Sequence, residues 1–194
     1  MALYAIIWVL IIFATYIVCR AVYERVRFFF KLLSLRRRLK KLDRNGMEVE
    51  YLQKFSKIAF GDKGRTNFTV KTKDKIYRVT VLAFAVTRGR WNIEKAEDRY
   101  YAEVRAYNNM FYRVHNNSGT EPEHSKDYRR ETRITRKRLY LSEEKTEGEK
   151  ILLVYPKPKA LTYADYKFHY ASSGDKIFGY TALYEDDFFE MLQA

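Results

Sequence analysis

The sequence predicts an α+β protein in which an N-terminal transmembrane helix and a basic juxtamembrane helix precede one globular domain with a mostly antiparallel sheet and two to three helices. Three observations predict this arrangement. Residues 2–19 carry no charge, residues 20–44 are rich in arginine and lysine around a leucine repeat, and the remainder mixes helical periodicity with β-rich runs. The predicted boundaries are an anchor at 1–20, a basic amphipathic helix at 21–46 and a cytoplasmic α+β domain at 47–194.

The first segment, Ala2 to Cys19, reads ALYAIIWVLIIFATYIVC. As a helix it would extend about 27 Å, close to the ~30 Å hydrocarbon thickness of a bilayer. A signal peptide fits poorly because no lysine or arginine precedes the apolar run. We therefore predict a single-pass anchor, and a buried N-terminal helix of a soluble protein is the alternative.

Orientation follows from the charges beside this segment. Ten arginines and lysines lie between Arg20 and Arg44, whereas only the α-amine precedes the apolar run. The positive-inside rule then predicts a cell-membrane protein with its N-terminus outside and its C-terminal domain in the cytoplasm. The single cysteine, Cys19, leaves no disulfide framework, which agrees with this orientation.

The second segment carries an apolar seam on a basic helix. Its apolar residues recur at spacings of four and three, and Asn45-Gly46 ends the pattern. The seam consists of Phe28, Leu32, Leu35, Leu39 and Leu42. We predict contact with anionic lipid headgroups through Arg36, Arg37, Arg38, Lys40, Lys41 and Arg44. Self-association through Leu32, Leu35, Leu39 and Leu42 is a second interpretation, and nucleic-acid contact is a third.

The domain elements are expected in the following order. Residues 47–60 show helical spacing, 67–86 read as a β-hairpin around a polar turn, and 97–114 favour a helix with a strand as the alternative. Residues 115–127 form a polar loop. Residues 132–142 and 150–163 then read as paired strands around an acidic turn, 176–184 as a last strand and 185–192 as a short terminal helix.

The order of elements over 47–115 resembles restriction-endonuclease-like (PD-(D/E)XK) domains. In that family a strand Asp and a (D/E)-x-K motif on the next strand hold a divalent metal and position the attacking water. Here Asn67 stands where the Asp would be, and Arg78-Val79-Thr80 stands where the motif would be. The resemblance implies a degenerate, non-catalytic relative, and an unrelated α+β domain is the alternative.

A second basic run lies at 126–138 and is the best nucleic-acid candidate within the domain. Its phosphate-binding residues would be Arg129, Arg130, Arg133, Arg136, Lys137 and Arg138. In a strand, Arg133 and Arg136 would point to opposite faces and dilute the patch. A membrane-facing patch and a solvated strand face are the alternatives.

Catalytic chemistry finds little support in the sequence. The three histidines, His115, His124 and His169, lack the spacing of paired metal ligands. The acidic group that begins at Glu185 suits the first turn of a helix. We predict no catalytic residue, metal or cofactor, and whether the protein is an enzyme stays open, with the balance against it.

The charge is concentrated near the N-terminus. Residues 1–58 carry 12 basic and 4 acidic residues, whereas residues 59–194 carry 25 and 20. The expected function is therefore a single-pass membrane-anchored protein with a non-catalytic cytoplasmic binding or adaptor domain, a subunit of a membrane-associated assembly. Its expected partners are the lipid bilayer, anionic headgroups, and other membrane proteins or a second copy. The alternative is a membrane-tethered nucleic-acid-binding protein with a degenerate nuclease-like domain.

Overall fold

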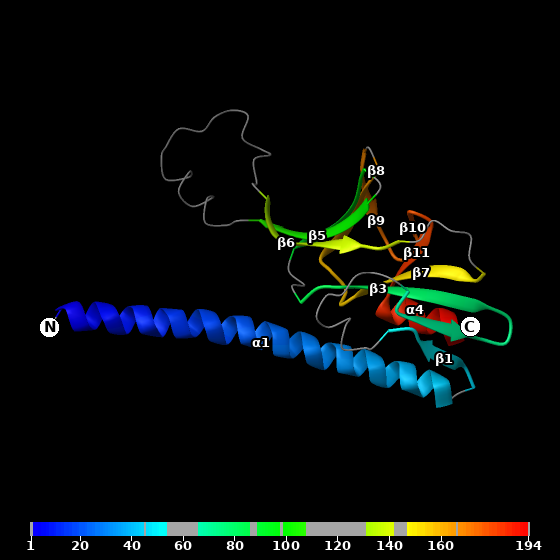
Figure 1. The fold of residues 1–194 in the computed structure, drawn as a ribbon, viewed down its shortest axis with the longest axis horizontal. Helices are drawn as coiled ribbons and strands as arrows, with labels where there is room; N and C mark the ends of the chain where they lie inside the picture. The colour runs from blue at the N-terminus through cyan, green and yellow to red at the C-terminus, as the bar shows by residue number, and fades with distance from the viewer. Residues whose placement is uncertain are drawn as a thin grey trace.

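The computed structural model describes residues 2–44, 46–53, 66–85, 89–97, 99–107, 131–141, 147–165 and 167–193. Within them, one long helix, a short C-terminal helix and two β-sheets form three layers (Figure 1). The helices α1 (Ala2–Arg44) and α4 (Glu185–Gln193) cover one face of the first sheet, and the second sheet covers its other face.

The first sheet has six strands in the order β1-β2-β3-β7-β11-β10. Their bounds are β1 Glu48–Tyr51, β2 Phe68–Lys71, β3 Ile76–Ala83, β7 Glu149–Tyr155, β11 Tyr180–Tyr184 and β10 Lys176–Ile177. The central strand β7 runs parallel to both β3 and β11, and the other pairings are antiparallel. This sheet is therefore mixed.

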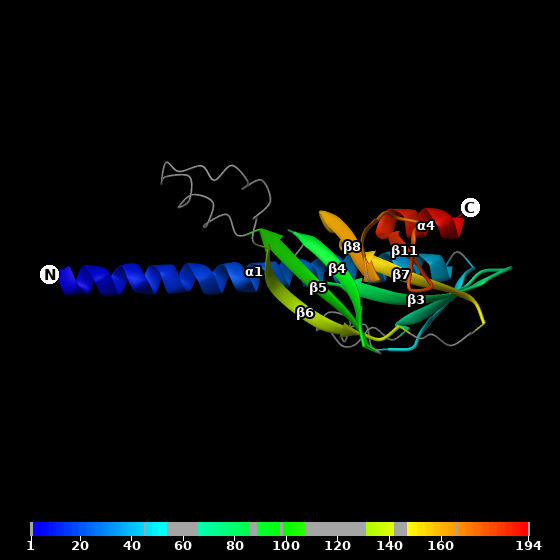
Figure 2. The ribbon, with the colours of Figure 1, turned by 90° about the horizontal axis from the view of Figure 1, so that it is seen from above.

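The second sheet has five strands in the order β6-β5-β4-β8-β9. Their bounds are β6 Glu131–Leu139, β5 Arg99–Tyr107, β4 Arg90–Ala96, β8 Ala160–Asp165 and β9 Lys167–Ala171. Strands β4 and β8 are parallel, and the remaining pairs are antiparallel. Figure 2, seen from above, shows its strands lying across α1, while Figure 1 shows the first sheet between them.

Two apolar cores hold these layers together. Strand β3 contributes to both, because successive side chains of a strand point to opposite faces. Val79 and Val81 pack into the core beneath the helices, whereas Leu82, together with Phe84 just after the strand, packs between the two sheets. The C-terminal half of β3 is therefore buried on both of its faces, whereas the edge strand β1 is largely exposed.

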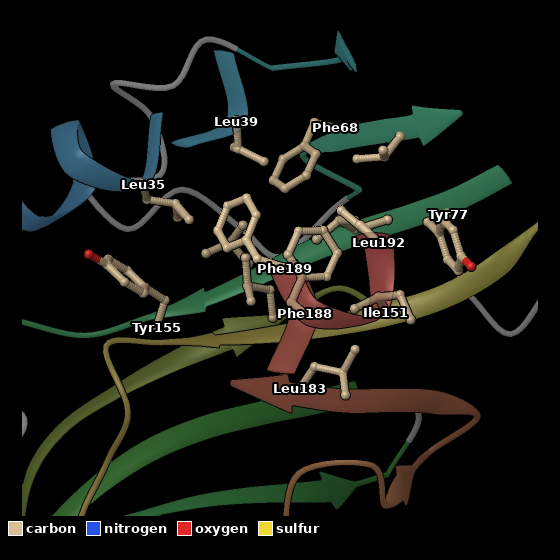
Figure 3. Packing of buried hydrophobic residues seen from close by; sticks show 14 of the residues in the cluster. Leu35, Leu39, Phe68, Tyr77, Ile151, Tyr155, Leu183, Phe188, Phe189 and Leu192 are labelled. Carbon is tan, nitrogen blue, oxygen red and sulfur yellow. The ribbon is translucent and has the colours of Figure 1, made fainter. Parts of the chain in front are cut away.

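The C-terminal half of α1 packs its apolar seam onto the first sheet and α4. Phe28 and the four leucines of the seam are buried among residues of both elements. Figure 3 shows Leu35 and Leu39 beside Phe68, Phe188 and Phe189. The buried Tyr155 hydroxyl donates a hydrogen bond to the carbonyl oxygen of Lys31 at 2.7 Å, and burial raises the pKa of Tyr155. The seam is thus the contact that attaches the long helix to the domain.

The predicted fold class is wrong in its helices. No helix within the described residues is long and apolar enough to cross a membrane, so the transmembrane helix is not found. The predicted anchor and juxtamembrane helix are instead parts of one continuous helix from Ala2 to Arg44. The expected helix at 47–60 contains a strand, β1, and its remainder from residue 54 onward lies outside the described residues.

The predicted sheet is also wrong, because two mixed sheets replace one mostly antiparallel sheet. Residues 99–107 form β5, which confirms the strand alternative for that part of 97–114. The rest of that segment from residue 108 onward and the predicted polar loop at 115–127 lie outside the described residues. The segments expected to pair around the acidic turn lie in different sheets: β6 pairs with β5, and β7 pairs with β3 and β11. The hairpin of β2 and β3 and the terminal helix α4 are confirmed.

Candidate binding surfaces

The N-terminal half of α1 presents an apolar surface that the described part of the domain leaves exposed. We call residues 4–26 the projecting segment, since it extends beyond the sheets (Figure 1). Its exposed large apolar side chains are Tyr4, Ile6, Ile7, Trp8, Val9, Leu10, Ile11, Ile12, Phe13, Tyr16, Ile17, Val18, Val22, Tyr23 and Val26. Consecutive residues from Ile6 to Phe13 point in every direction around a helix, so the apolar surface surrounds it. Apolar surface on this scale marks an interaction site.

The predicted lipid-contact cations do not all have the same surroundings. Arg36, Arg37, Lys40 and Lys41 are exposed, and the side chain of Arg44 lies outside the described residues. At 100° per residue, Arg37 and Lys41 lie roughly opposite the buried seam, whereas Lys40 and Arg36 lie toward one side of the helix. Phe29 and Phe30 are also exposed at the start of this docked half of α1. The face of α1 that points away from the domain is therefore both cationic and apolar.

Arg38 differs from the other cations because it forms ion pairs that link α1 to α4. Its Nη1 lies 2.9 Å from Glu185 Oε1 and 3.1 Å from Asp186 Oδ1. Its guanidinium carbon also lies 4.2 Å from the ring centroid of Phe189. The sequence identified the two acids only as the start of a helix, because their partner is 147 or more positions away in the chain.

The leucines considered for self-association contact the chain's own core. Leu32, Leu35, Leu39 and Leu42 are at most 3% exposed, and they pack against the first sheet and α4. A second copy would have to displace the domain to reach them. In this fold the seam serves intramolecular docking.

The second basic run is distributed over both faces of β6. Arg129 and Arg130 lie outside the described residues, as does the side chain of Arg133. Arg136 and Arg138 are exposed, whereas Lys137 lies on the inner face, 3.3 Å from the Ala83 carbonyl oxygen and 5.0 Å from the Phe84 ring centroid. Lys137 therefore points into the domain and is not part of the predicted phosphate-binding patch.

A register shift changes the expected separation of Arg133 and Arg136. Their Cα partners are Arg105 and Glu103, which are two positions apart on β5, because the ladder is irregular between Val104 and Arg105. A regular strand would separate the two arginines by three positions and place them on opposite sides. The backbone ladder therefore departs from regular alternation between these two positions, for a reason that sequence periodicity does not contain.

The outer face of the five-stranded sheet carries arginines, two acids and aromatic rings. The outer face is the side of this sheet that points away from the first sheet. Trp91, Ala102 and Leu161 point inward into the core between the sheets, so their neighbours along each strand point to the outer face. Its described polar and aromatic side chains are Arg90, Asn92, Glu94, Tyr101, Glu103, Arg105, Arg136, Arg138, Thr162, Phe168 and Tyr170. Sequence reasoning identified two of them, Arg136 and Arg138; the alternation in residues 167–171 is the signal that could have found Phe168 and Tyr170.

A hydrogen-bonded row crosses the middle of this face. Thr162 Oγ1 donates to Asn92 Oδ1 at 3.0 Å, and Asn92 Nδ2 donates to Glu103 Oε1 at 3.4 Å. Glu103 is fully buried and is bound by the guanidinium of Arg105. A buried carboxylate needs such compensation, since an isolated one is costly to desolvate. The row therefore fixes β5, β4 and β8 relative to one another.

The nuclease-like positions have structural partners. Asn67 is buried; its Oδ1 accepts a hydrogen bond from the Val81 N–H at 2.7 Å, and its Nδ2 donates to Gln53 Oε1 at 3.2 Å. Arg78 Nε donates to the Glu147 carbonyl oxygen at 2.8 Å. Among the described residues no group of three or more metal-ligating side chains comes together. The resemblance stays a prediction. In the structure, Asn67 and Arg78 form hydrogen bonds with the segments that lie next to them.

Comparison with known proteins identifies no relative: no family model, curated protein or solved structure matches this chain. The two surfaces described above, the projecting segment with its cationic continuation and the outer face of the second sheet, are therefore the basis for function.

Proposed function

We propose that this chain is a non-catalytic binding protein that works at a membrane, with α1 lying along the lipid surface and the β-domain held above it. The observation that carries the proposal is the exposed apolar surface of the projecting segment. Trp8 and Phe13 are 63% and 62% exposed. Burying one large apolar side chain contributes roughly 1.5–3 kcal/mol. Lipid contact by several of them would therefore be strongly favourable.

The orientation of the helix follows from its docked half. The seam faces the domain, while the exposed Arg37 and Lys41 lie roughly opposite it and the exposed Lys40 and Arg36 lie toward one side. A helix lying along an anionic membrane would place these cations at the headgroups and the domain on the far side. Phe29 and Phe30, also exposed, would add apolar contact between the projecting segment and the cations. Such contact does not require the helix to cross the bilayer.

The domain is proposed to act by binding because the two glutamates of the outer face are held in ion pairs. Glu94 is bound by Arg136, and Glu103 by Arg105. Catalytic pairs of carboxylates instead converge on a shared site. Membership of a larger assembly and a cytoplasmic location for the domain stay predictions from the sequence pattern.

Vesicle flotation of the full chain tests the apolar contact. The wild type is expected to float with neutral phosphatidylcholine vesicles, and the double variant Ile7→Asp with Ile11→Asp is expected to lose at least about tenfold in partitioning. Burying a carboxylate costs several kcal/mol, and 1.4 kcal/mol corresponds to tenfold. Leu52→Asp is the matched control, because Leu52 is an exposed apolar residue of the domain. A wild type that stays in the lipid-free fraction contradicts the proposal.

Charge variants test the orientation. Replacing Arg36, Arg37, Lys40 and Lys41 together by Gln should weaken binding to vesicles that contain phosphatidylserine and leave binding to neutral vesicles unchanged. In an upright helix these cations would lie about 15 Å beyond Val26, farther than the ~8 Å Debye length at physiological salt. Equal binding of variant and wild type to anionic vesicles would therefore argue against the flat orientation.

A further inference from the structure

The outer face of the five-stranded sheet combines exposed aromatic rings with guanidinium groups. Tyr170 is 78% exposed and Phe168 is 52% exposed, and both lie on β9 at the edge of this sheet. Four described arginines, on β4, β5 and β6, share the face with two glutamates. We propose that this face binds single-stranded nucleic acid, with bases stacked on the β9 rings and phosphates held by the arginines.

The aromatic part of the proposal rests on the position of the two rings. Phe168 and Tyr170 pair with Ala164 and Thr162 of β8 on the outer side, whereas the buried Ala171 pairs with the inward Leu161. Arg90, two strands away on β4, lies with its guanidinium carbon 4.8 Å from the Phe168 ring centroid. Because Arg90 lies over the ring of Phe168, Tyr170 is the more open of the two rings for stacking with a base. Unpaired bases stack on such aromatic and arginine surfaces.

The charged part rests on Arg136 and Arg138 at the opposite edge. Arg136 is bound by Glu94 and lies 4.0 Å from the Tyr101 ring centroid, measured from its guanidinium carbon. Arg138 is exposed and stacks on Tyr140 at 4.6 Å. A guanidinium has five N–H donors, and one carboxylate engages at most two of them, so Arg136 retains donors for phosphate. Both arginines are held in place by rings, which reduces the entropy lost on binding.

The layer order favours nucleic acid over lipid as the occupant. The first sheet lies between α1 and the outer face (Figure 1). Stacked sheets are about 10 Å apart, so a membrane in contact with α1 would lie two layers away from this face. The proposal does not depend on membrane binding, and a chain that fails to float on vesicles could still bind nucleic acid here.

Fluorescence anisotropy of the full chain in non-ionic detergent, with a labelled oligothymidylate of about 12 nucleotides, tests the proposal. We expect the wild type to bind the single strand more tightly than a duplex of equal length. Tyr170→Ala should weaken binding at least about fivefold, because stacking contributes at each base. It should leave the salt dependence unchanged, since tyrosine carries no charge. Tyr23→Ala, the same change at another exposed tyrosine, on α1, is the matched control.

Arg138→Gln tests the phosphate contact through a different readout. The slope of log K against log salt should become shallower by about 0.7, the value for one phosphate on a single strand. Lys176→Gln, which removes an exposed cation on β10 of the other sheet, should leave the slope unchanged. This pair separates a local contact from the general effect of net charge.

Several outcomes would overturn the proposal. One is the absence of measurable single-strand binding. Another is binding that persists in Tyr170→Ala and Arg138→Gln but disappears when Arg36, Arg37, Lys40 and Lys41 are replaced by Gln. A third is weaker binding of Tyr170→Ala to phosphatidylserine vesicles with unchanged affinity for the oligonucleotide, which would assign the face to lipid.

Discussion

Some single residues of the β-domain have structural roles that cannot be predicted from their residue type alone. Asn67 precedes β2, and its side-chain oxygen accepts a hydrogen bond from the Val81 N–H on β3. Val81 lies beyond Val79, the last residue of β3 that pairs with β2. Its backbone N–H donates to the Val79 carbonyl oxygen at 2.8 Å. One amide side chain thus replaces the partner that a longer strand would have supplied. This role explains an asparagine at that position without any metal chemistry.

Removing this side chain should cost stability. Asn67→Ala leaves the buried Val81 N–H without its acceptor, and an unsatisfied buried donor costs about 1–3 kcal/mol. Urea denaturation should show a decrease of that size in the free energy of unfolding. Lys73→Ala, on the exposed turn of the same hairpin, should change it by less than about 0.5 kcal/mol. Equal effects of the two substitutions would contradict the assigned role.

Lys137 is a second residue whose type conflicts with its position. It lies on the inner side of β6, and burial lowers the pKa of its ammonium group. The folded state therefore releases this proton more readily than the unfolded state, in which the pKa is 10.5. Burying the charge destabilises the fold at neutral pH, and this cost disappears as the pH rises through the lowered pKa toward 10.5.

Lys137→Met should therefore be more stable than the wild type at neutral pH. Methionine fills a similar volume without a charge to desolvate. The difference in the free energy of unfolding should shrink as the pH is raised from 7 toward 10.5, as measured by urea denaturation of both proteins at matched pH. A difference that stays constant with pH would show that the charge of Lys137 is not the cause.

At the scale of elements, α1 has two halves with different surroundings. Up to Val26 its large apolar side chains are exposed, whereas from Phe28 onward the seam is buried in the domain. A 43-residue helix keeps both halves on one axis. The domain therefore holds the projecting segment in a defined direction.

Shortening a side chain of the seam should lower the stability of the fold, and shortening one of the projecting segment should not. Leu39 is fully buried, so Leu39→Ala should lower the free energy of unfolding by about 3 kcal/mol through lost contacts and a cavity. Leu10→Ala, the same change at an exposed position, should alter it by less than about 0.5 kcal/mol. Chemical denaturation in detergent compares the two variants. Similar losses would place Leu10 in a folded contact that the described structure lacks.

Strand β5 shows why one element was mistaken for another. Tyr100 and Val104 are four positions apart, a spacing that fits both a helix and every second residue of a strand. Burial of the intervening Ala102 shows the period of two. An alanine between Tyr100 and Val104 gives only a weak apolar signal in the sequence, so the helical interpretation appeared equally regular.

At the scale of the whole molecule, the first sheet is the centre of a three-layer structure. Its strands β3 and β7 are covered by the helices on one side and by the second sheet on the other. Ile151, Leu152, Leu153 and Val154 of β7 are all fully buried, which is typical of a strand with two buried faces. The second sheet contributes one face to the core, and its other side is the outer face.

Hydrogen exchange should reproduce this order of layers. Amide hydrogens of β3 and β7 should exchange slowest, because their exposure requires disruption of both cores. Those of β9, an edge strand with four exposed side chains, should exchange earliest among the strands of the second sheet. Mass spectrometry of peptides covering these strands measures the difference. Faster exchange in β7 than in β9 would contradict the arrangement.

The sequence by itself determined the apolar character of the projecting segment, the seam and the cations opposite it, the β2–β3 hairpin and the helix α4. These features depend on neighbours within a few residues, so periodicity and charge reveal them. Only the tertiary structure decided that the seam packs on this chain's own sheet, that β7 lies between β3 and β11, and that β9 aromatics share a face with β6 arginines. Those contacts join residues far apart in the chain, and no local pattern distinguishes their partners.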